Sequence, residues 1–261
     1  MQRIYSFIFF ALTVFLLLPG CGKYQAATMI NEPSGLELSQ TLLENLKAKK
    51  TAKATINKIA ALDPQMLLAE LDTKDKQLAF WLNMYNGSMQ YLLTTQPGLW
   101  EDRNDLFSGE RVTVAGKLLS PEDIEHGIIR GGEAKLGLGF IPKFFPSKFE
   151  RTFKIDGGDG RVHFALNCGA IDCPPVEIYA AETVDERLDH RTTVYLKKHT
   201  TVDVENENII ATPLFSWFKG DFDGVDDFLV RFGIITEDQK SFSRDSKDYD
   251  WTLATNVYAE D

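Results

Sequence analysis

Two histidines and two cysteines are the side chains in this sequence best suited to catalysis. Cys168 and Cys173 stand in the stretch RVHFALNCGAIDCPP at 161–175, together with His163, and His126 lies upstream. A cysteine nucleophile needs a base within about 3 Å of its sulfur. On an extended strand, His163 would lie roughly 16 Å from Cys168. The sequence therefore favours His126 as the base of any thiol site.

Cys168 and Cys173 have a second interpretation, as a disulfide. Only Gly-Ala-Ile-Asp separates them, and so short a segment can fold back and join the two sulfurs. The closed loop would stabilise the fold by roughly 2 kcal/mol. We predict this disulfide, with the thiol nucleophile as the alternative. The prediction requires an oxidising compartment.

The N-terminus predicts such a compartment. Arg3 precedes an apolar run at residues 4–18, which is the pattern of a secretion signal. The run is shorter than the roughly 20 apolar residues of a membrane-spanning helix. LPGC at 18–21 is similar to the bacterial lipobox, which implies that residues 1–20 are removed and Cys21 is acylated. A plain secretory signal cut near Gly20 is the alternative.

We therefore expect an exported lipoprotein of the cell envelope, whose partner is the membrane through lipid at Cys21. Gly22 is no retention signal for the inner membrane, so in a Gram-negative host we expect the periplasmic face of the outer membrane. Residues 21–35 are then lipidated Cys21 and a flexible tether.

Charge and composition exclude several other classes of partner. Removal of Arg3 with the signal takes the formal net charge from −10 to about −11, which opposes binding to nucleic acid. His126, His163 and Cys168 lack a recognised zinc-ligand spacing, and we predict no metal and no cofactor. GDFDGVDD at 220–227 lacks the terminal glutamate of a calcium loop, because that position is Phe232. We interpret it as a solvated turn.

The candidate residues depend on three elements for their positions. A long apolar helix at 73–95 places Asn83, Asn86 and Gln90 on one face, which indicates either a structural hydrogen-bond network or the wall of a polar site. A helix at 121–130, capped by Ser120 and ended by the glycines at 131–132, carries His126.

On that helix His126 shares a stripe with Glu122 and Arg130. The stripe is either a solvated ladder of charge pairs, each worth about 0.2–0.5 kcal/mol, or the lining of a cleft. The third element is a strand at 161–166, whose alternation places His163 beside Arg161. There His163 is either a structural residue or a site residue.

The rest of the chain predicts the fold class. Residues 36–72 form a helical prefix, and 73–261 form one α+β domain with a mixed or antiparallel sheet packed against helices. Further helices are expected at 184–198 and 225–233, paired short strands between 200 and 212, and an edge strand at 249–258.

Four separated motifs carry a family resemblance. AFWLNMYN at 79–86, DIEHGIIR at 123–130, the stretch at 161–175 and LFSWFKGDF at 214–222 together resemble the domain-of-unknown-function 547 family, over about 75–235. The resemblance implies no particular reaction. It supports one set of candidate cleft or catalytic residues: His163, Cys168, His126, Asn83, Asn86 and Arg130.

Two functions remain open. In the first, which we favour, the domain is a non-catalytic binding or interaction module with a Cys168–Cys173 disulfide. In the second it is a thiol hydrolase of amide or ester bonds in the envelope, with Cys168 as nucleophile and His126 as base. In that case Asn83 or Asn86 would orient the base or stabilise the oxyanion.

Overall fold

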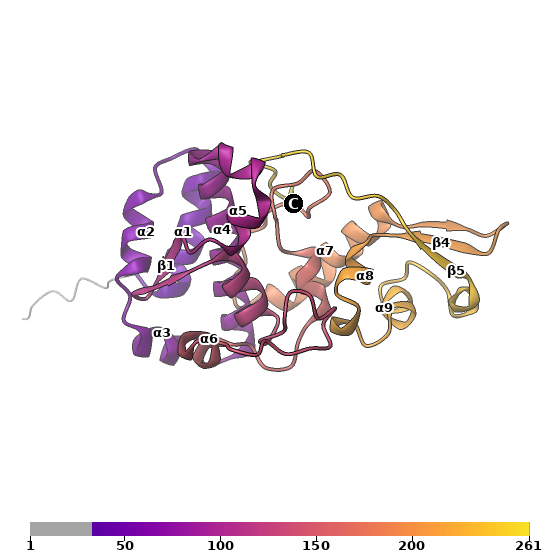
Figure 1. Ribbon diagram of the computed structural model, residues 1–261, viewed down its shortest axis with the longest axis horizontal. Coiled ribbons are helices and arrows are strands. Elements are labelled where there is room, and N and C mark those ends of the chain that lie inside the picture. The colour runs from indigo at the N-terminus through magenta and orange to yellow at the C-terminus, as the bar shows by residue number, and fades with distance from the viewer. Residues whose placement is uncertain (1–32, 261) are drawn as a thin grey trace, which may run out of the picture. The chain divides into compact units, whose positions relative to one another are not determined.

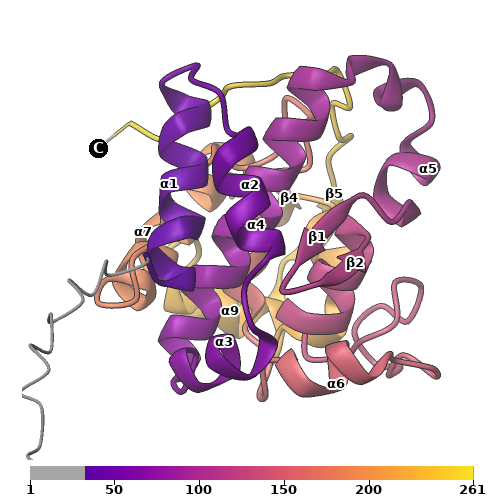
Figure 2. The same cartoon turned by 90° about the vertical axis from the view of Figure 1, so that its left-hand side faces the viewer.

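The long apolar helix predicted from the sequence forms the centre of the fold. Helix α4 runs from Lys74 to Thr95, and the Thr73 hydroxyl accepts a hydrogen bond from the Lys76 N–H at its start. Its side chains are buried from residue 78 to residue 93 with one exception, Tyr91. A helix that is apolar on nearly all sides must be covered on all sides. Helix α1 (Gly35–Lys47) packs along it, as Figure 1 and Figure 2 show from two directions.

The computed structural model describes residues 33–260, which lie within one compact unit. The predicted signal at 1–20, the predicted lipidation site Cys21 and the predicted tether up to residue 32 lie outside the described residues. The last two residues assigned to the tether, Ser34 and Gly35, instead form the start of helix α1. Within residues 33–260, no helix has the length and apolar character that a membrane crossing requires.

The predicted helical prefix shares its core with α4. Ser34 and Glu37 form a reciprocal capping box at the start of α1, and Asp63 caps α3 (Pro64–Glu70) by accepting from two backbone N–H groups. Helix α2 (Lys53–Ala60) lies between them in the chain. Leucines of this prefix belong to the same apolar cluster as α4, so the prefix is part of the domain.

A small hairpin, a second sheet and several short helices complete the architecture. Strands β1 (Val112–Val114) and β2 (Lys117–Leu119) pair antiparallel. In the second sheet, β3 (Thr201–Asp203) and β4 (Asn208–Ala211) pair antiparallel, and β5 (Ser243–Ser246) pairs parallel to β4. This mixed sheet, packed with helices, confirms the predicted α+β class. The remaining elements in chain order are η1 (Pro97–Glu101), α5 (Arg103–Ser108), η2 (Asp123–Ile129), α6 (Lys148–Phe153), η3 (Gly160–Phe164), α7 (Val184–His199), α8 (Leu214–Trp217), η4 (Lys219–Asp221), α9 (Val225–Arg231) and η5 (Glu237–Ser241).

The elements enclose two apolar cores. The first surrounds α4, and the second is rich in phenylalanine and lies among α7, α8, α9 and β4. In Figure 1 the first occupies the indigo and magenta part of the chain and the second the orange part.

Residues 161–166 do not form the predicted strand. Residues 160–164 form η3, a 3₁₀ helix. The Asp159 carboxylate accepts from the Arg161 backbone N–H and binds its guanidinium, which closes a tight turn at this point. All five residues of η3 are buried, so their alternation of apolar and polar types does not mark two faces of a strand. The separation of roughly 16 Å between His163 and Cys168 was predicted for an extended strand. Because the segment is a 3₁₀ helix, that prediction does not apply.

The predicted helix at 121–130 is present, but its central part is a π-helix, η2. Ser120 and Asp123 exchange hydrogen bonds at its start. Gly131 and Gly132 follow it with φ of 72° and 90°, a conformation that glycine adopts without strain. A π-helix has a wider turn than an α-helix and is often found at functional sites.

The segment at 247–260, called here the C-terminal segment, is not the continuous edge strand that was predicted. It makes only isolated bridges, such as Ala170 with Leu253 and Val176 with Tyr258. Between them, Asn256 donates its backbone N–H to the Gln90 side chain on α4. In Figure 1 this yellow segment leads from β5 back towards the first core.

Candidate functional site

A cavity of about 350 Å³ brings together three of the predicted site residues. His126, His163 and Cys168 all line it. Most of its wall is apolar and comes from segments far apart in the chain, including Phe107, Leu138, Leu166, Leu214, Trp217 and Trp251. The other lining side chains that carry charge or can titrate are Tyr85, Glu122, Glu125, Lys135 and Tyr249. A largely apolar pocket with a few convergent polar groups is the usual form of a small-molecule site.

Helix η2 supplies Glu125 and His126 to the polar side of this cavity, and Glu122 immediately precedes the helix. His126 is 7% exposed, so the prediction of a solvated ladder of charge pairs is wrong and the cleft-lining alternative holds. Its Nδ1 lies 2.9 Å from Nη1 of Arg130. Because a guanidinium can only donate, Nδ1 is the acceptor and the proton of neutral His126 sits on Nε2. Burial, reinforced by the Arg130 charge, lowers the pKa of His126 to about 3.

Asp221 joins Arg130 to the second histidine. Its carboxylate accepts two hydrogen bonds from Arg130, at 2.6 and 2.9 Å, and lies 2.7 Å from Nε2 of His163. The Arg130 side chain is fully buried and that of Asp221 is 8% exposed. Although burial alone would raise it, hydrogen bonds from His163 and Arg130 bring the pKa of Asp221 down to about 2.

His163 is held in one orientation by this carboxylate and by stacking. Its ring lies 4.0 Å from the Phe218 ring at an angle of 11°. Since the ionised Asp221 carboxylate can only accept, Nε2 of His163 donates and Nδ1 of the neutral ring is left as an acceptor. Burial lowers the pKa of His163, so the neutral form prevails near pH 7. Both rings are therefore the Nε2–H tautomer, but the nitrogen outside these contacts differs, a donor (Nε2–H) on His126 and an acceptor (Nδ1) on His163.

Glu125 is a site residue that the sequence reasoning missed. Its side chain is 15% exposed, it lines the cavity, and the Tyr85 hydroxyl hydrogen-bonds to it. Burial raises the pKa of this carboxyl, although the neighbouring His163, Arg130 and Lys135 oppose the rise. A carboxyl within a motif that already carried His126 was the available sequence signal.

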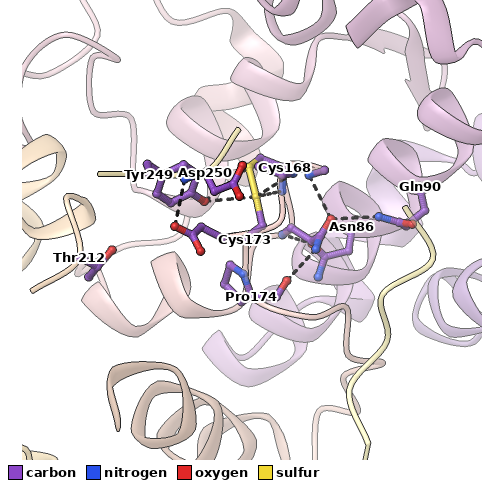
Figure 3. Close-up of a disulfide and its surroundings, with 12 residues drawn as sticks. Asn86, Gln90, Cys168, Cys173, Pro174, Thr212, Tyr249 and Asp250 are labelled. Atoms are coloured by element: carbon purple, nitrogen blue, oxygen red, sulfur yellow. Dashed lines mark hydrogen bonds between the residues drawn. A yellow bond between two sulfur atoms is a disulfide. The ribbon is translucent and has the colours of Figure 1, made fainter. Parts of the chain in front are cut away.

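The predicted disulfide is present. Cys168 and Cys173 are bonded, and the N–H groups of Cys168 and Ala170 both point at the Cys173 sulfur, at 3.1 and 3.3 Å. The Tyr249 hydroxyl lies 3.3 Å from the same sulfur, and Figure 3 shows how Tyr249 reaches the bridge. A disulfide sulfur is not a nucleophile, so in this state Cys168 contributes to the cavity wall and not to thiol chemistry.

The asparagines of α4 do not line this cavity. Asn83 pairs with both backbone groups of Tyr179. Asn86 accepts from the Asn167 N–H and donates to the Ala165 carbonyl, which holds the segment before the disulfide against α4 (Figure 3). Of the two alternatives for these residues, the structure places them in the hydrogen-bond network.

Asp221 corrects a second prediction from the sequence. The segment at 220–227 was interpreted as a solvated turn, yet Asp221 is a buried partner of Arg130 and His163. The reason is tertiary, because the loop after η2 covers η4: the Gly220 N–H donates to the Leu138 carbonyl at 2.7 Å.

A larger cavity of about 600 Å³ is lined by Arg130 and Asp221 together with several glycines and other aspartates. Its charged groups largely satisfy one another, as with Arg161, which binds Asp159, Asp185 and Asp189. Both histidines of the network and Cys168 face the smaller cavity, so we take the smaller cavity as the candidate site. Among the residues that the structure describes, no three His, Cys, Asp or Glu side chains converge as a metal site.

Comparison with known proteins gives one family. Residues 68–196 match the family described as "Protein of unknown function, DUF547", and they include Glu125, both histidines and both cysteines of the site. The motif at 214–222, with Asp221, lies beyond the matched residues. No curated protein and no solved structure was found to match. Residues 68–196, which contain most of the candidate site, are therefore assigned to the DUF547 family.

Proposed function

We propose that this protein is an exported, lipid-anchored protein of the cell envelope whose domain binds a small amphipathic ligand. The observation that carries the binding role is the 350 Å³ cavity, in which apolar walls meet a set of buried, oriented polar groups. The two histidines are fixed in defined tautomers before any ligand enters, and such preorganisation favours binding.

The disulfide favours binding over thiol catalysis. Of the two cysteines in residues 33–260, Cys168 lines the cavity, and its sulfur is bonded to Cys173. An oxidising compartment preserves that bond, which agrees with export through residues 1–20. The lipid anchor rests on the LPGC sequence at 18–21. In a host with two membranes we place the protein at the periplasmic face of the outer membrane.

Fluorescence tests the binding role. N-phenyl-1-naphthylamine, a neutral amphipathic dye, should bind purified residues 33–261 and quench the tryptophans of the cavity wall. Replacing Trp217, which is 36% exposed and lines the cavity, by Ala should weaken binding about tenfold, equivalent to ~1.4 kcal/mol of lost apolar contact. Phe145→Ala is the matched control, because Phe145 is 93% exposed and lies outside the cavity lining. Equal dye affinity in all three proteins would refute the cavity as the binding site.

Two further measurements test the redox state and the anchor. Alkylation of the non-reduced protein should leave Cys168 and Cys173 unmodified, whereas rapid alkylation of Cys168 would restore the thiol hydrolase as the better function. Cells fed labelled palmitate should label the full chain but not its Cys21→Ser variant. Label in neither protein would refute the lipid anchor without affecting the binding role.

A further inference from the structure

Among the charged side chains that line the cavity or lie beside Glu125 in the described part of the chain, Glu125 is the one without an oppositely charged partner in direct contact. Two cations lie near it, and each is already matched by a carboxylate in direct contact: Arg130 by Asp221 and Lys135 by Glu122. The two histidines are neutral near pH 7, because burial lowers the pKa of each. An ionised Glu125 therefore gives this side of the cavity a net negative charge.

The protein itself leaves the Glu125 carboxylate under-solvated. Its hydrogen-bond donor is the Tyr85 hydroxyl, whereas a carboxylate has about four acceptor sites. Nδ1 of His126 lies 3.7 Å from Glu125, but that nitrogen accepts from Arg130 and has no proton to donate. A buried carboxylate without a partner is costly and either stays protonated or takes a cation.

The groups that face Glu125 come from every neighbouring element. Helix α4 supplies Tyr85 and η3 supplies His163. Helix η2 supplies His126, and the residues that flank it supply Glu122 and Arg130. The loop after η2 supplies Lys135, and the C-terminal segment supplies the Tyr249 hydroxyl. Each positive charge in this set has its own carboxylate partner, so none of them is left to neutralise Glu125.

The rest of the wall suits an organic cation. Trp217, Tyr249 and Trp251 pack on one another, with ring centroids 4.9–5.9 Å apart, and all three line the cavity. Aromatic faces attract cations, most strongly when water is excluded. The chain already uses this attraction twice nearby, with Arg130 over Phe218 and Arg103 over Trp251.

We propose that the cavity binds an organic cation, an alkylammonium or quaternary ammonium group, with Glu125 as its counter-ion and the aromatic residues as its cage. This inference rests on the proposed binding function and names the chemical class of the ligand. A small hydrated metal ion fits less well, because the site offers one available carboxylate and mainly apolar walls.

Two probes of equal shape isolate the contribution of charge. Choline and 3,3-dimethyl-1-butanol differ in a quaternary nitrogen against a carbon, and each can be titrated as a competitor of the bound dye. At pH 7.5 choline should bind at least about tenfold more tightly than the alcohol. Glu125→Gln should reduce this preference to less than about twofold, with the affinity for the alcohol unchanged. Glu237→Gln, on the exposed helix η5, should keep the full preference.

The pH dependence gives an independent reading. Because the pKa of Glu125 is raised, the carboxyl is protonated at acidic pH, and the preference for choline should grow as the pH rises through that pKa. Tyr85→Phe removes the hydrogen bond to the carboxylate and should move the midpoint of this growth to higher pH. The shift tests the role of Glu125 without altering its side chain.

The outcomes separate the two proposals. Equal binding of the two competitors, or a preference that survives Glu125→Gln, would overturn the cation inference while the dye still reports a working cavity. The cation inference is also overturned if dye binding persists and choline fails to compete. Failure of the dye itself to bind would overturn the proposed function as well.

Discussion

Asp221→Asn tests whether the buried network holds the domain together. The substitution keeps the shape of the side chain and removes its charge. The Arg130 guanidinium, whose side chain is fully buried, then has no anion in contact. Removing one partner of a buried ion pair is costly because the other charge stays buried and uncompensated.

Two routes give the magnitude of the loss. The difference between the pKa of about 2 for Asp221 in the folded protein and its ordinary value of 3.8 corresponds to about 2 kcal/mol. Breaking a buried pair costs about 3–5 kcal/mol by mutation. We therefore expect the free energy of unfolding to fall by about 2–5 kcal/mol. For a domain of this size that lowers Tm by about 4–20 °C.

Urea unfolding at pH 7.5, followed by tryptophan fluorescence, measures this loss. Asp227→Asn is the control, since Asp227 is 71% exposed and pairs with Lys240 at the surface, where a pair contributes at most about 1 kcal/mol. Adding Arg130→Met to Asp221→Asn should recover part of the stability, because no unpaired charge then remains. If Asp221→Asn costs no more than Asp227→Asn, the network does not stabilise the fold as argued.

The pH dependence of the same residue gives a second check. Its pKa is lower in the folded protein than in the unfolded chain, so its contribution is complete above about pH 4 and is lost as the pH falls towards 2. The Asn variant has no such contribution to lose, and its stability should change less over that range.

Three further predictions concern the other buried groups. Cys168→Ala with Cys173→Ala should lower the free energy of unfolding by about 2 kcal/mol, and reductant should have the same effect on the unaltered protein. The pKa of His126 falls to about 3 on folding. As the pH falls from about 6 to 4, this residue takes up a proton in the unfolded chain but not in the folded protein, which should reduce the free energy of unfolding by up to about 1.4 kcal/mol per pH unit. His126→Gln should flatten that slope in urea titrations made at each pH. Asn86→Ala should cost about 2–4 kcal/mol, since it leaves two buried backbone groups unpaired; a loss below about 1 kcal/mol would refute this.

Local signals in the sequence predicted much of the fold. Caps such as Asp63 before Pro64, and Thr73 before the apolar run of α4, mark helix starts because the capping contacts lie within three residues. The paired strands near 201–211 were predicted because the two partners of this hairpin are also close together in the sequence. The 3₁₀ helix at His163 was not predicted, because residues 161–166 alternate apolar and polar types as a half-buried strand does, although residues 160–164 are all buried.

Some residues of the candidate site could likewise be predicted from the sequence, whereas others could not. Residue type alone identified His126, His163 and the cysteines as candidate site residues, because few other side chains can act as a base or a nucleophile near neutral pH. Asp221 and Glu125 were missed because their environment depends on segments distant in sequence, such as the loop over η4. An aspartate in GDFDGVDD has the same local sequence whether it is solvated or buried, and only the contact with Arg130 distinguishes the two states.

The C-terminal segment determines the order in which the cavity can form during folding. It supplies Tyr249 and Trp251 to the wall, and its contact with Gln90 joins residues 166 positions apart. Contacts over such separations form slowly, because the entropy of closing the loop is lost before the contact stabilises anything. We expect both apolar cores to form before the C-terminal segment adds Tyr249 and Trp251 to the cavity wall. Ligand affinity should then appear only in the last kinetic phase of refolding, so occupancy of the cavity would mark molecules whose folding is finished.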